Sequence, residues 1–313
     1  MMDKIKVVFL ATPDIAIKSF EFFINSNDYE VLALVTQAPK TKNRGHKIVE
    51  NNIVKIAKSN SIAVFEPEKI SKDEDAIKSL KQMNPDFFVT FAFGQILSQE
   101  VIDIPKIATI NLHASLLPKY RGANPISEVI ADGCAKTGIT TMKTVLALDA
   151  GDICMQEEIE IPVCMNVIEL MEEISLKSPN LLDKTLKGLF NKTITPFAQD
   201  ESKATFTKKI KKEEKLVDFN TDAVVLHNKI RAMYKINTNH MVFQGKIIKI
   251  LKTMPSIVTA NPAQVVEIAK DKIVVGCKTG SIEIYTVKPE GKGEMNAADW
   301  ARGARIKIGD YIK

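Results

Sequence analysis

The sequence lacks the features of secreted, zinc-binding and membrane-spanning proteins. Its four cysteines lie far apart without a Cys-x-x-Cys pair, which argues against a zinc site or a disulfide scaffold and favours a reducing, intracellular setting. No stretch approaches the roughly 20 apolar residues that cross a bilayer. The first residues also lack the long apolar core and the cleavage site of a signal peptide. We therefore expect a cytoplasmic protein with no metal and no membrane partner.

The length and the charge distribution indicate two domains with different partners. At 313 residues, of which 45% are hydrophobic and 26% charged, the chain is long enough for two cores. Residues 1–204 carry 23 basic and 27 acidic side chains (net −4), whereas residues 205–313 carry 20 and 11 (net +9). A basic tail of this kind favours a polyanionic partner, although a merely solvated Lys-rich surface gives the same count.

The first two thirds of the chain read as an α/β domain. Short apolar runs alternate with amphipathic stretches, which predicts a doubly wound, mostly parallel sheet of the Rossmann-like type. The expected strands are residues 5–11, 30–36, 86–91 and 107–112, and the expected helices are 13–24, 50–58, 73–83 and 167–190. Two further strands, 137–146 and 153–161, flank a tight turn and should run antiparallel at the edge of the sheet.

A lysine-rich stretch without apolar periodicity separates this part from the rest. We predict a catalytic domain over residues 1–195, a linker over 196–207 and a C-terminal domain over 208–313. The last part contains one helix and several short strands broken by Pro, Gly and Lys, which suits a small β-barrel of the OB-like type. Its expected elements are the helix 223–233 and the strands 247–251, 264–269, 272–277 and 281–287.

Two polar residues stand where a buried strand ends. Asn111 and His113 alternate along the last turn of the strand, so both side chains point to the same side. Ligands of open α/β sheets bind at the carboxyl ends of the strands. There an imidazole can move a proton and a carboxamide can donate a hydrogen bond to a developing oxyanion. The alternative is a polar strand end whose hydrogen bonds are satisfied within the protein.

The turn Leu148-Asp149-Ala150-Gly151-Asp152 offers a carboxylate to the same site. A carboxylate beside His113 would favour its imidazolium form and fix its orientation. No Ser or Cys nucleophile accompanies the three polar residues, which argues for direct group transfer rather than covalent catalysis. The alternative is a simple hairpin turn, because Asp and Gly favour turns by themselves.

These segments together resemble the folate-dependent formyltransferases. The resemblance is carried by Asn111 to Pro118, by Arg121-Gly122-Ala123 with Pro125-Ile126, and by the turn around Asp149. It implies 10-formyltetrahydrofolate as the formyl donor, with Asn111, His113 and Asp149 as catalytic residues. The loop that it assigns to folate binding contains Ser115, Leu116, Leu117 and Pro118.

Further segments are similar to the branch of this family that acts on methionyl-tRNA in translation initiation. They are residues 8–14, 36–39, 43–47, 92–97, 207–219 and 229–232. This similarity implies a monomer whose acceptor is initiator methionyl-tRNA. The basic loop with Arg44 and Lys47 would reach the acceptor stem, and the C-terminal barrel with Lys208 and Lys209 would bind the RNA.

The sequence departs from the family pattern at two places. Ala11 stands where Gly is common, and residues 233–239 replace an Asn-Pro-Trp-Pro-like run. Two other functions stay open at this point. A sugar-nucleotide formyltransferase would share the first domain and act on an amino sugar. An inactive module that only binds folate or RNA would keep the fold.

Overall fold

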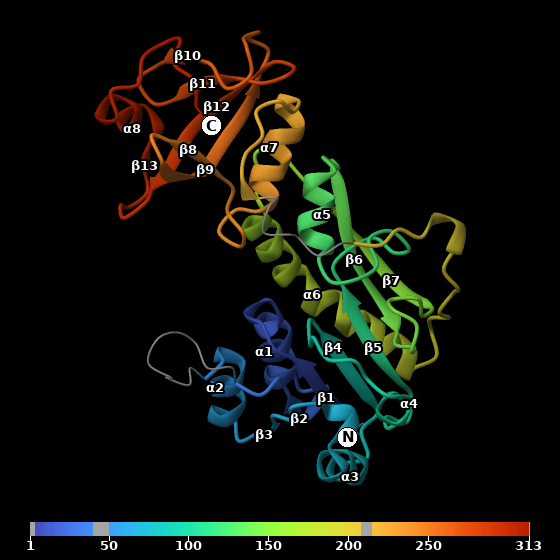
Figure 1. Ribbon diagram of the computed structural model, residues 1–313. Helices are drawn as coiled ribbons and strands as arrows, with labels where there is room; N and C mark the ends of the chain where they lie inside the picture. The colour runs from blue at the N-terminus through green and yellow to red at the C-terminus, as the bar shows by residue number, and fades with distance from the viewer. Residues whose placement is uncertain (1–3, 40–49, 208–214, 313) are drawn as a thin grey trace. The chain divides into compact units, whose positions relative to one another are not determined.

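The computed structural model describes residues 4–39, 50–207 and 215–312. By the contacts between Cα atoms the chain divides into two compact units, which are drawn in Figure 1. Unit 1 comprises Met1–Gly122, Thr137–Ile159 and Met171–Phe206. Unit 2 comprises Ala123–Lys136, Glu160–Leu170 and Thr207–Lys313. The chain therefore passes repeatedly from one unit to the other.

The described residues of unit 1 form the predicted sheet, with seven strands in the order β3-β2-β1-β4-β5-β6-β7. The five strands β3, β2, β1, β4 and β5 pair with their neighbours in parallel. Strand β6 pairs antiparallel with β5. In chain order the strands are β1 (Ile5–Ala11), β2 (Tyr29–Val35), β3 (Ala63–Phe65), β4 (Phe87–Phe91), β5 (Ala108–His113), β6 (Lys136–Lys143) and β7 (Ile153–Glu160). The α/β fold class is confirmed. The short strand β3 was not expected, since three residues carry too little pattern.

Helices cover both faces of this sheet (Figure 1). On one face the rings of Phe9, Phe20, Phe23 and Tyr29 pack together with centroids 4.6–5.9 Å apart. A second apolar cluster lies on the other face. It contains Val8 of β1 and buried side chains of α3 and α4. The helical elements are η1 (Asp14–Ala16), α1 (Ile17–Asn25), α2 (Asn52–Ser59), η2 (Ile70–Lys72), α3 (Glu74–Gln82), α4 (Gln99–Ile102), α6 (Val167–Phe190) and η3 (Glu201–Lys203).

The strand order places the topological switch point of the sheet between β1 and β4. Chain order reverses between these two strands, which is where open α/β sheets bind ligands. Strand β5 pairs with β4, so its last residues lie one strand away from this switch point. Ala11 is fully buried as the last residue of β1 and pairs with Phe91. The regular strand therefore accepts alanine at this position.

The connection between β6 and β7 is longer than the sequence predicts. Strand β6 ends at Lys143 rather than at Leu146, because the amide of Lys143 already bonds the carbonyl of Asp152, at 2.9 Å. The amide of Thr144 bonds the carbonyl of Thr109 at 2.8 Å, so the loop leaves the sheet beside the start of β5. The next residues then return toward His113. A Cβ atom on Gly151 would lie 1.8 Å from the carbonyl oxygen of Lys143, so this loop requires glycine there.

Unit 2 is built on an antiparallel sheet in the order β10-β11-β12-β9-β8, with β13 on β12. This agrees with the predicted small β-barrel domain. Its strands are β8 (His240–Phe243), β9 (Lys246–Ser256), β10 (Val265–Ile268), β11 (Ile273–Gly276), β12 (Ser281–Pro289) and β13 (Met295–Asn296). Its helices are α5 (Pro125–Ala131), α7 (Ala223–Ala232) and α8 (Ala297–Gly303). The sequence predicted α7, but not α5, α8, β8 or β13.

Helix α7 is fixed by buried polar side chains. The ring of His227, only 2% exposed, lies between the hydroxyl of Thr253 (2.9 Å) and the carbonyl of Val163 (2.8 Å). Arg231 donates to Asn228 Oδ1 at 2.9 Å and to the carbonyl of Met165 at 2.8 Å. Residues 160–166 are thus held by α7 within unit 2. This histidine therefore fixes the packing of α7.

Candidate active site

Asn111 lies in β5 with its amide group fixed at one end. The hydroxyl of Thr90, the neighbouring residue on β4, donates to Asn111 Oδ1 at 2.7 Å. Because Oδ1 is the accepting atom, the NH2 group of the side chain points away from Thr90. Within the described part of the chain this NH2 group has no hydrogen-bond partner, and Asn111 is half-buried. It is therefore a positioned donor for an oxygen of a bound molecule.

His113 and Asp149 meet beside it, as the sequence suggested. His113 is the last residue of β5 and is 6% exposed. Its Nε2 donates to the carbonyl of Tyr120 at 2.9 Å, and its Nδ1 lies 3.6 Å from Asp149 Oδ2. That distance is too long for a hydrogen bond but short enough for an ion pair once Nδ1 is protonated. Nδ1 is therefore the nitrogen at which the ring can accept a proton.

The protonation of the ring is decided by burial. Burial lowers the pKa of His113 below its ordinary 6.5, whereas the charge of Asp149 and the carbonyl of Tyr120 raise it. Burial is the largest of the three effects, so the net direction is downward. The expected imidazolium is thus not the resting form at neutral pH. A neutral ring beside a carboxylate can take a proton and keep it as an ion pair.

The Asp149 turn is held by backbone groups on two sides. Asp149 has φ 49°, in the left-handed region that a non-glycine residue occupies only when its surroundings impose it. Its Oδ2 accepts a hydrogen bond from the amide of Gly122 at 2.7 Å. The amide group of Gln199 donates to the carbonyls of Asp149 and Gly151, at 2.8 and 2.7 Å. Sequence patterns alone do not identify Thr90, Gly122 or Gln199 as parts of this site.

The loop expected to bind folate is itself tightly held. Ser115 is fully buried and its hydroxyl donates to the carbonyl of Lys119 at 2.7 Å. Leu117 is 4% exposed, and its amide and carbonyl bond Thr140 and Gln156, at 3.2 and 2.9 Å. Leu116 lies over Gly138, where a Cβ atom would come within 2.4 Å of it, and Pro118 is half-buried after a cis peptide bond. The loop has a fixed shape next to His113.

The four basic residues expected to contact RNA cannot be placed. Arg44, Lys47, Lys208 and Lys209 all lie outside the described residues. No group of three or more His, Cys, Asp or Glu side chains that could hold a metal ion occurs in residues 4–39, 50–207 and 215–312. In the same residues no helix is long and apolar enough to cross a membrane.

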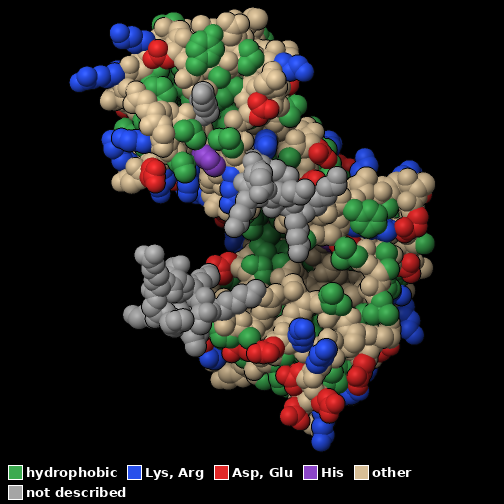
Figure 2. Space-filling model, in the orientation of Figure 1, with side chains coloured by type: hydrophobic (Ala, Val, Ile, Leu, Met, Phe, Trp, Pro, Cys, Tyr) green, Lys and Arg blue, Asp and Glu red, His purple; other side chains and the backbone are tan. Residues whose placement is uncertain are grey.

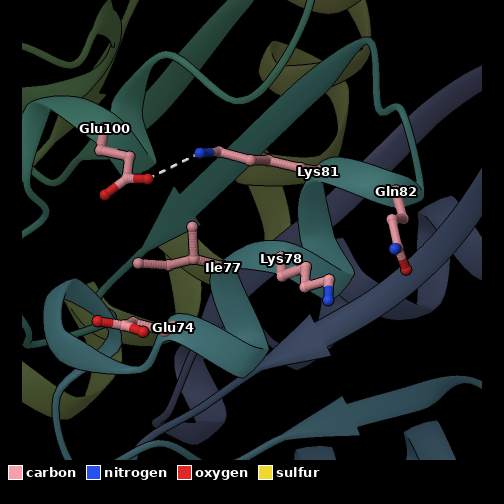
Figure 3. A pocket seen from close by; sticks show the side chains of 6 residues that line it. All are labelled: Glu74, Ile77, Lys78, Lys81, Gln82 and Glu100. Carbon is pink, nitrogen blue, oxygen red and sulfur yellow. Dashed lines mark hydrogen bonds and ion pairs between the residues drawn. The ribbon is translucent and has the colours of Figure 1, made fainter.

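Two surface hollows lie apart from this site. The hollow in Figure 3 is lined by side chains of α3 and by Glu100 of α4, and Lys81 and Glu100 form a 2.7 Å ion pair there. The other, in unit 2, runs along residues 242–245 with Asp310 and Tyr311. Neither hollow includes Asn111, His113 or Asp149. The polar cluster at the end of β5 is therefore the candidate active site on chemical grounds.

Comparisons with known proteins agree with this reading. The family model described as "Formyl transferase" matches residues 5–186, and that described as "Formyl transferase, C-terminal domain" matches residues 209–305. The chain belongs to the formyltransferase family. This formyltransferase is 36% identical to a protein of Sulfurihydrogenibium sp. (strain YO3AOP1) named methionyl-tRNA formyltransferase, over 98% of this chain and 100% of the relative. It is also 36% identical to the protein of that name from Bacillus subtilis (strain 168), over 98% of this chain and 97% of the relative.

Solved structures share the fold of this formyltransferase at lower identity. A sugar 3N-formyl transferase crystallised with dTDP and 5-N-formyl-THF has a TM-score of 0.67 at 19% identity, over 93% of this chain and 100% of that one. An N-formyltransferase from Helicobacter canadensis, in complex with folinic acid and dTDP-3-aminofucose, has a TM-score of 0.65 at 19% identity, over 92% and 100%. At this identity the likeness concerns the fold.

Proposed function

We propose that this formyltransferase transfers a formyl group from 10-formyltetrahydrofolate to the α-amine of methionine on initiator methionyl-tRNA, for translation initiation. The observation that carries the choice of acceptor is the 36% identity to methionyl-tRNA formyltransferases over nearly the whole of both chains, the C-terminal part included. The candidate active site supplies the groups that such a transfer needs. Asn111, His113 and Asp149 are the proposed catalytic residues.

The residues around the site suit a folate-bound formyl group. Asn111 offers an unpaired NH2 group for a carbonyl-type oxygen. In the loop before Asp149 the side chains of Val145, Leu146 and Leu148 are exposed, at 44–64%, and can cover a flat ring. Folate supplies a formyl carbon that an amine can attack. We assign the fixed loop Ser115, Leu116, Leu117 and Pro118 to one wall of its binding site.

His113 and Asp149 handle the proton in this proposal. The neutral ring accepts the proton that the attacking amine loses, at Nδ1, and the carboxylate 3.6 Å away stabilises the resulting imidazolium. The ring then returns the proton to the departing nitrogen. Tyr120 O binds the opposite nitrogen throughout, which keeps the ring in one orientation. General acid–base catalysis of this kind contributes about 10²- to 10⁴-fold to a rate.

Asn111 stabilises the negative charge that develops on the formyl oxygen. Thr90 holds its side chain before the reaction, so the amide does not have to reorient as charge develops. One such donor contributes about 3 kcal/mol to lowering the barrier. With the proton acceptor on the same side of β5, the two halves of the transfer occur within one small region.

Unit 2 offers two exposed lysines, next to a histidine whose pKa burial and nearby lysines lower, to an RNA backbone. His240, Lys249 and Lys288 pair directly across strands β8, β9 and β12, so their side chains share one face of the sheet. Lys249 and Lys288 are exposed, and neither forms an ion pair within the described part of the chain. Figure 2 shows further Lys and Arg side chains on the surface of this unit. Unpaired cations in a row suit the regularly spaced phosphates of RNA.

The proposed acceptor also bears on where the protein acts. Initiator tRNA and folate occur in the cytoplasm, where we place the protein. We also propose that it acts as a monomer without a metal ion. Along the sequence, 1–195, 196–207 and 208–313 remain our proposal for the catalytic domain, the linker and the RNA-binding domain, although in space residues 196–206 pack with unit 1 and two earlier segments with unit 2.

One assay tests the function directly. The purified protein is incubated with 10-formyltetrahydrofolate in two separate reactions. One contains methionyl-tRNA as the acceptor, and the other contains an amino-sugar nucleotide. We expect formyl-methionyl-tRNA and no formylated sugar. Formylation of the sugar alone would replace the proposal with the sugar-nucleotide alternative. Absence of any product, with folate still bound, would support the inactive binding module.

A further inference from the structure

Arg121 is a buried cation at the edge of the active site. It is 3% exposed and lies two residues before the chain enters unit 2. Its guanidinium makes a two-pronged contact with Glu201, from Nη1 at 2.9 Å and from Nη2 at 2.6 Å. Its backbone amide bonds the carbonyl of Thr205 at 2.8 Å. A buried guanidinium is stable only when its donors are satisfied, so this contact fixes its plane.

Gln199 connects this cation to the catalytic turn. Its Oε1 accepts from Arg121 Nε at 3.1 Å and from Nη2 at 2.7 Å. Its Nε2 donates to the backbone carbonyls of Asp149 and Gly151, at 2.8 and 2.7 Å. The oxygen end thus accepts two hydrogen bonds, and the nitrogen end makes two to the turn besides a longer contact, at 3.9 Å, with the sulfur of Met142. Arg121 determines which end is the oxygen, and hence which end faces the turn.

The turn needs such support. Asp149 holds a left-handed backbone conformation, φ 49°, which is unfavourable for a non-glycine residue unless its surroundings compensate. Its carboxylate must also stay near His113 Nδ1, at 3.6 Å, for the proton transfer described above. The amide of Gly122 fixes the carboxylate, but only Gln199 side-chain bonds reach the carbonyls of the turn among the described residues.

We propose that Gln199, oriented by Arg121 and Glu201, is a positioning residue that sets the place of the Asp149 carboxylate relative to His113. This role rests on the proposed catalytic function of Asp149 and His113. Gln199 itself lies too far along the network to meet the reacting atoms, since both of its ends are bonded within the protein. The segment 196–207, which the sequence presents as a linker, thus carries part of the active-site framework.

A purely structural role for Gln199 predicts a different outcome. Loss of a structural bond lowers the free energy of unfolding and leaves the folded molecules fully active. Loss of positioning moves the charge of Asp149 away from His113. Asp149 is the titratable group whose charge raises the pKa of His113. The pKa of the ring should therefore fall when Asp149 is displaced, even without substrate.

The decisive test is a titration of His113 by NMR in the full-length protein, wild type against Gln199→Ala. With four histidines in the chain, His113→Gln identifies the resonance. We expect a lower pKa in Gln199→Ala and a kcat reduced about 10- to 100-fold, since a shift of about 1 Å at the reacting groups has an effect of that size. The KM for the formyl donor should change less than about twofold, because the donor site keeps its groups.

Gln199→Glu separates the two ends of the side chain. It keeps an acceptor for Arg121 but replaces the donor NH2 with oxygen that faces two carbonyls, so kcat should fall at least as far as in Gln199→Ala. The matched control is Gln99→Ala, which removes an exposed glutamine that bonds Asp103 at 2.8 Å on α4. That control should keep wild-type kcat and the wild-type titration of His113.

Glu201→Gln covers the case in which Gln199→Ala fails to fold. Glu201 is 69% exposed, so its replacement spares the core while weakening the hold on Arg121. We expect a fall in kcat of about threefold and a shift of the His113 titration in the same direction. An unchanged titration in folded variants overturns the positioning role, whether or not the wild type formylates tRNA. Absence of formylation by the wild type overturns the proposed function alone.

Discussion

The two units use their polar side chains in opposite ways. In unit 1 the polar groups near His113 are held in place by hydrogen bonds, as buried Arg121 and half-buried Gln199 show. In unit 2 Lys249 and Lys288 stand exposed in a row without ion pairs within the described part of the chain. Bond-making chemistry needs fixed groups in a place sheltered from water. Attraction of a polyanion needs free charge, and mobile side chains serve that purpose.

The largest expected effect tests the fixed half of this contrast. His113→Ala removes the proposed proton acceptor, and kcat should fall about 10²- to 10⁴-fold. Folding and binding of the formyl donor should persist, because in the described part of the chain the polar partners of the ring are the carbonyl of Tyr120 and the carboxylate of Asp149. Kinetics, circular dichroism and a folate-binding titration measure the three quantities. Near-normal turnover would show that His113 has no catalytic role.

A smaller effect should follow when a fixed group is merely loosened. Thr90→Val removes the hydroxyl that holds Asn111 Oδ1 at 2.7 Å, so the amide can turn away from the developing charge. We expect kcat to fall about 5- to 10-fold, the equivalent of roughly one hydrogen bond. Thr109→Val is the control, because Thr109 is buried like Thr90. The hydroxyl of Thr109 donates to the carbonyl of Ile102 at 2.8 Å. Equal losses of kcat in both variants would contradict the role given to Thr90.

The free charges of unit 2 should affect binding and not chemistry. Lys249→Glu with Lys288→Glu should weaken the apparent affinity for tRNA, and its logarithmic salt dependence should become shallower by about 0.7–0.9 per lost phosphate contact. The KM for the formyl donor should stay the same. Lys72→Glu with Lys78→Glu, at two exposed lysines of unit 1, is the control matched for net charge. If that control weakens tRNA binding as much, the row on β9 and β12 is not the binding surface.

The smallest effect concerns a property that both units share. Burial lowers the pKa of His113 in unit 1 and of His227 in unit 2 below 6.5. The unfolded chain therefore takes up protons first as the pH falls, and the free energy of unfolding should decrease below about pH 6.5. Urea unfolding at a series of pH values measures this slope. His227→Gln, which can still donate to Val163, should flatten it, and an unchanged slope would mean that His227 is protonated when folded.

The sequence was sufficient for the regular parts of the fold. Apolar runs predict β1, β4 and β5 to within a residue or two, because strands buried on both faces leave a continuous signal. Period-two alternation also placed Asn111 and His113 on one side of β5. Helix α5 and strand β8 were not predicted, because their seven and four residues are too few for a clear apolar pattern.

The missing parts of the site depend on contacts between distant segments. Gln199 lies 50 residues from Asp149 and 78 from Arg121 along the chain, and no local pattern marks such a contact. Asp149 raises the pKa of His113 as the motif predicts, but the larger, opposite effect of burial is not visible in the sequence. The basic residues chosen for RNA lie outside the described residues, so their role stays a prediction.

The interleaved course of the chain limits how the enzyme could have been assembled or can be taken apart. Segments Ala123–Lys136 and Glu160–Leu170 lie inside the stretch matched by the first family model, yet they belong to unit 2. A cut after Phe206 would therefore leave unit 2 without α5 and without the segment that α7 grips through Arg231. Exchange of C-terminal parts between relatives would have to carry these two insertions along. Because each unit contains three separate segments of the chain, a recombination event with a single junction cannot exchange one whole unit for another.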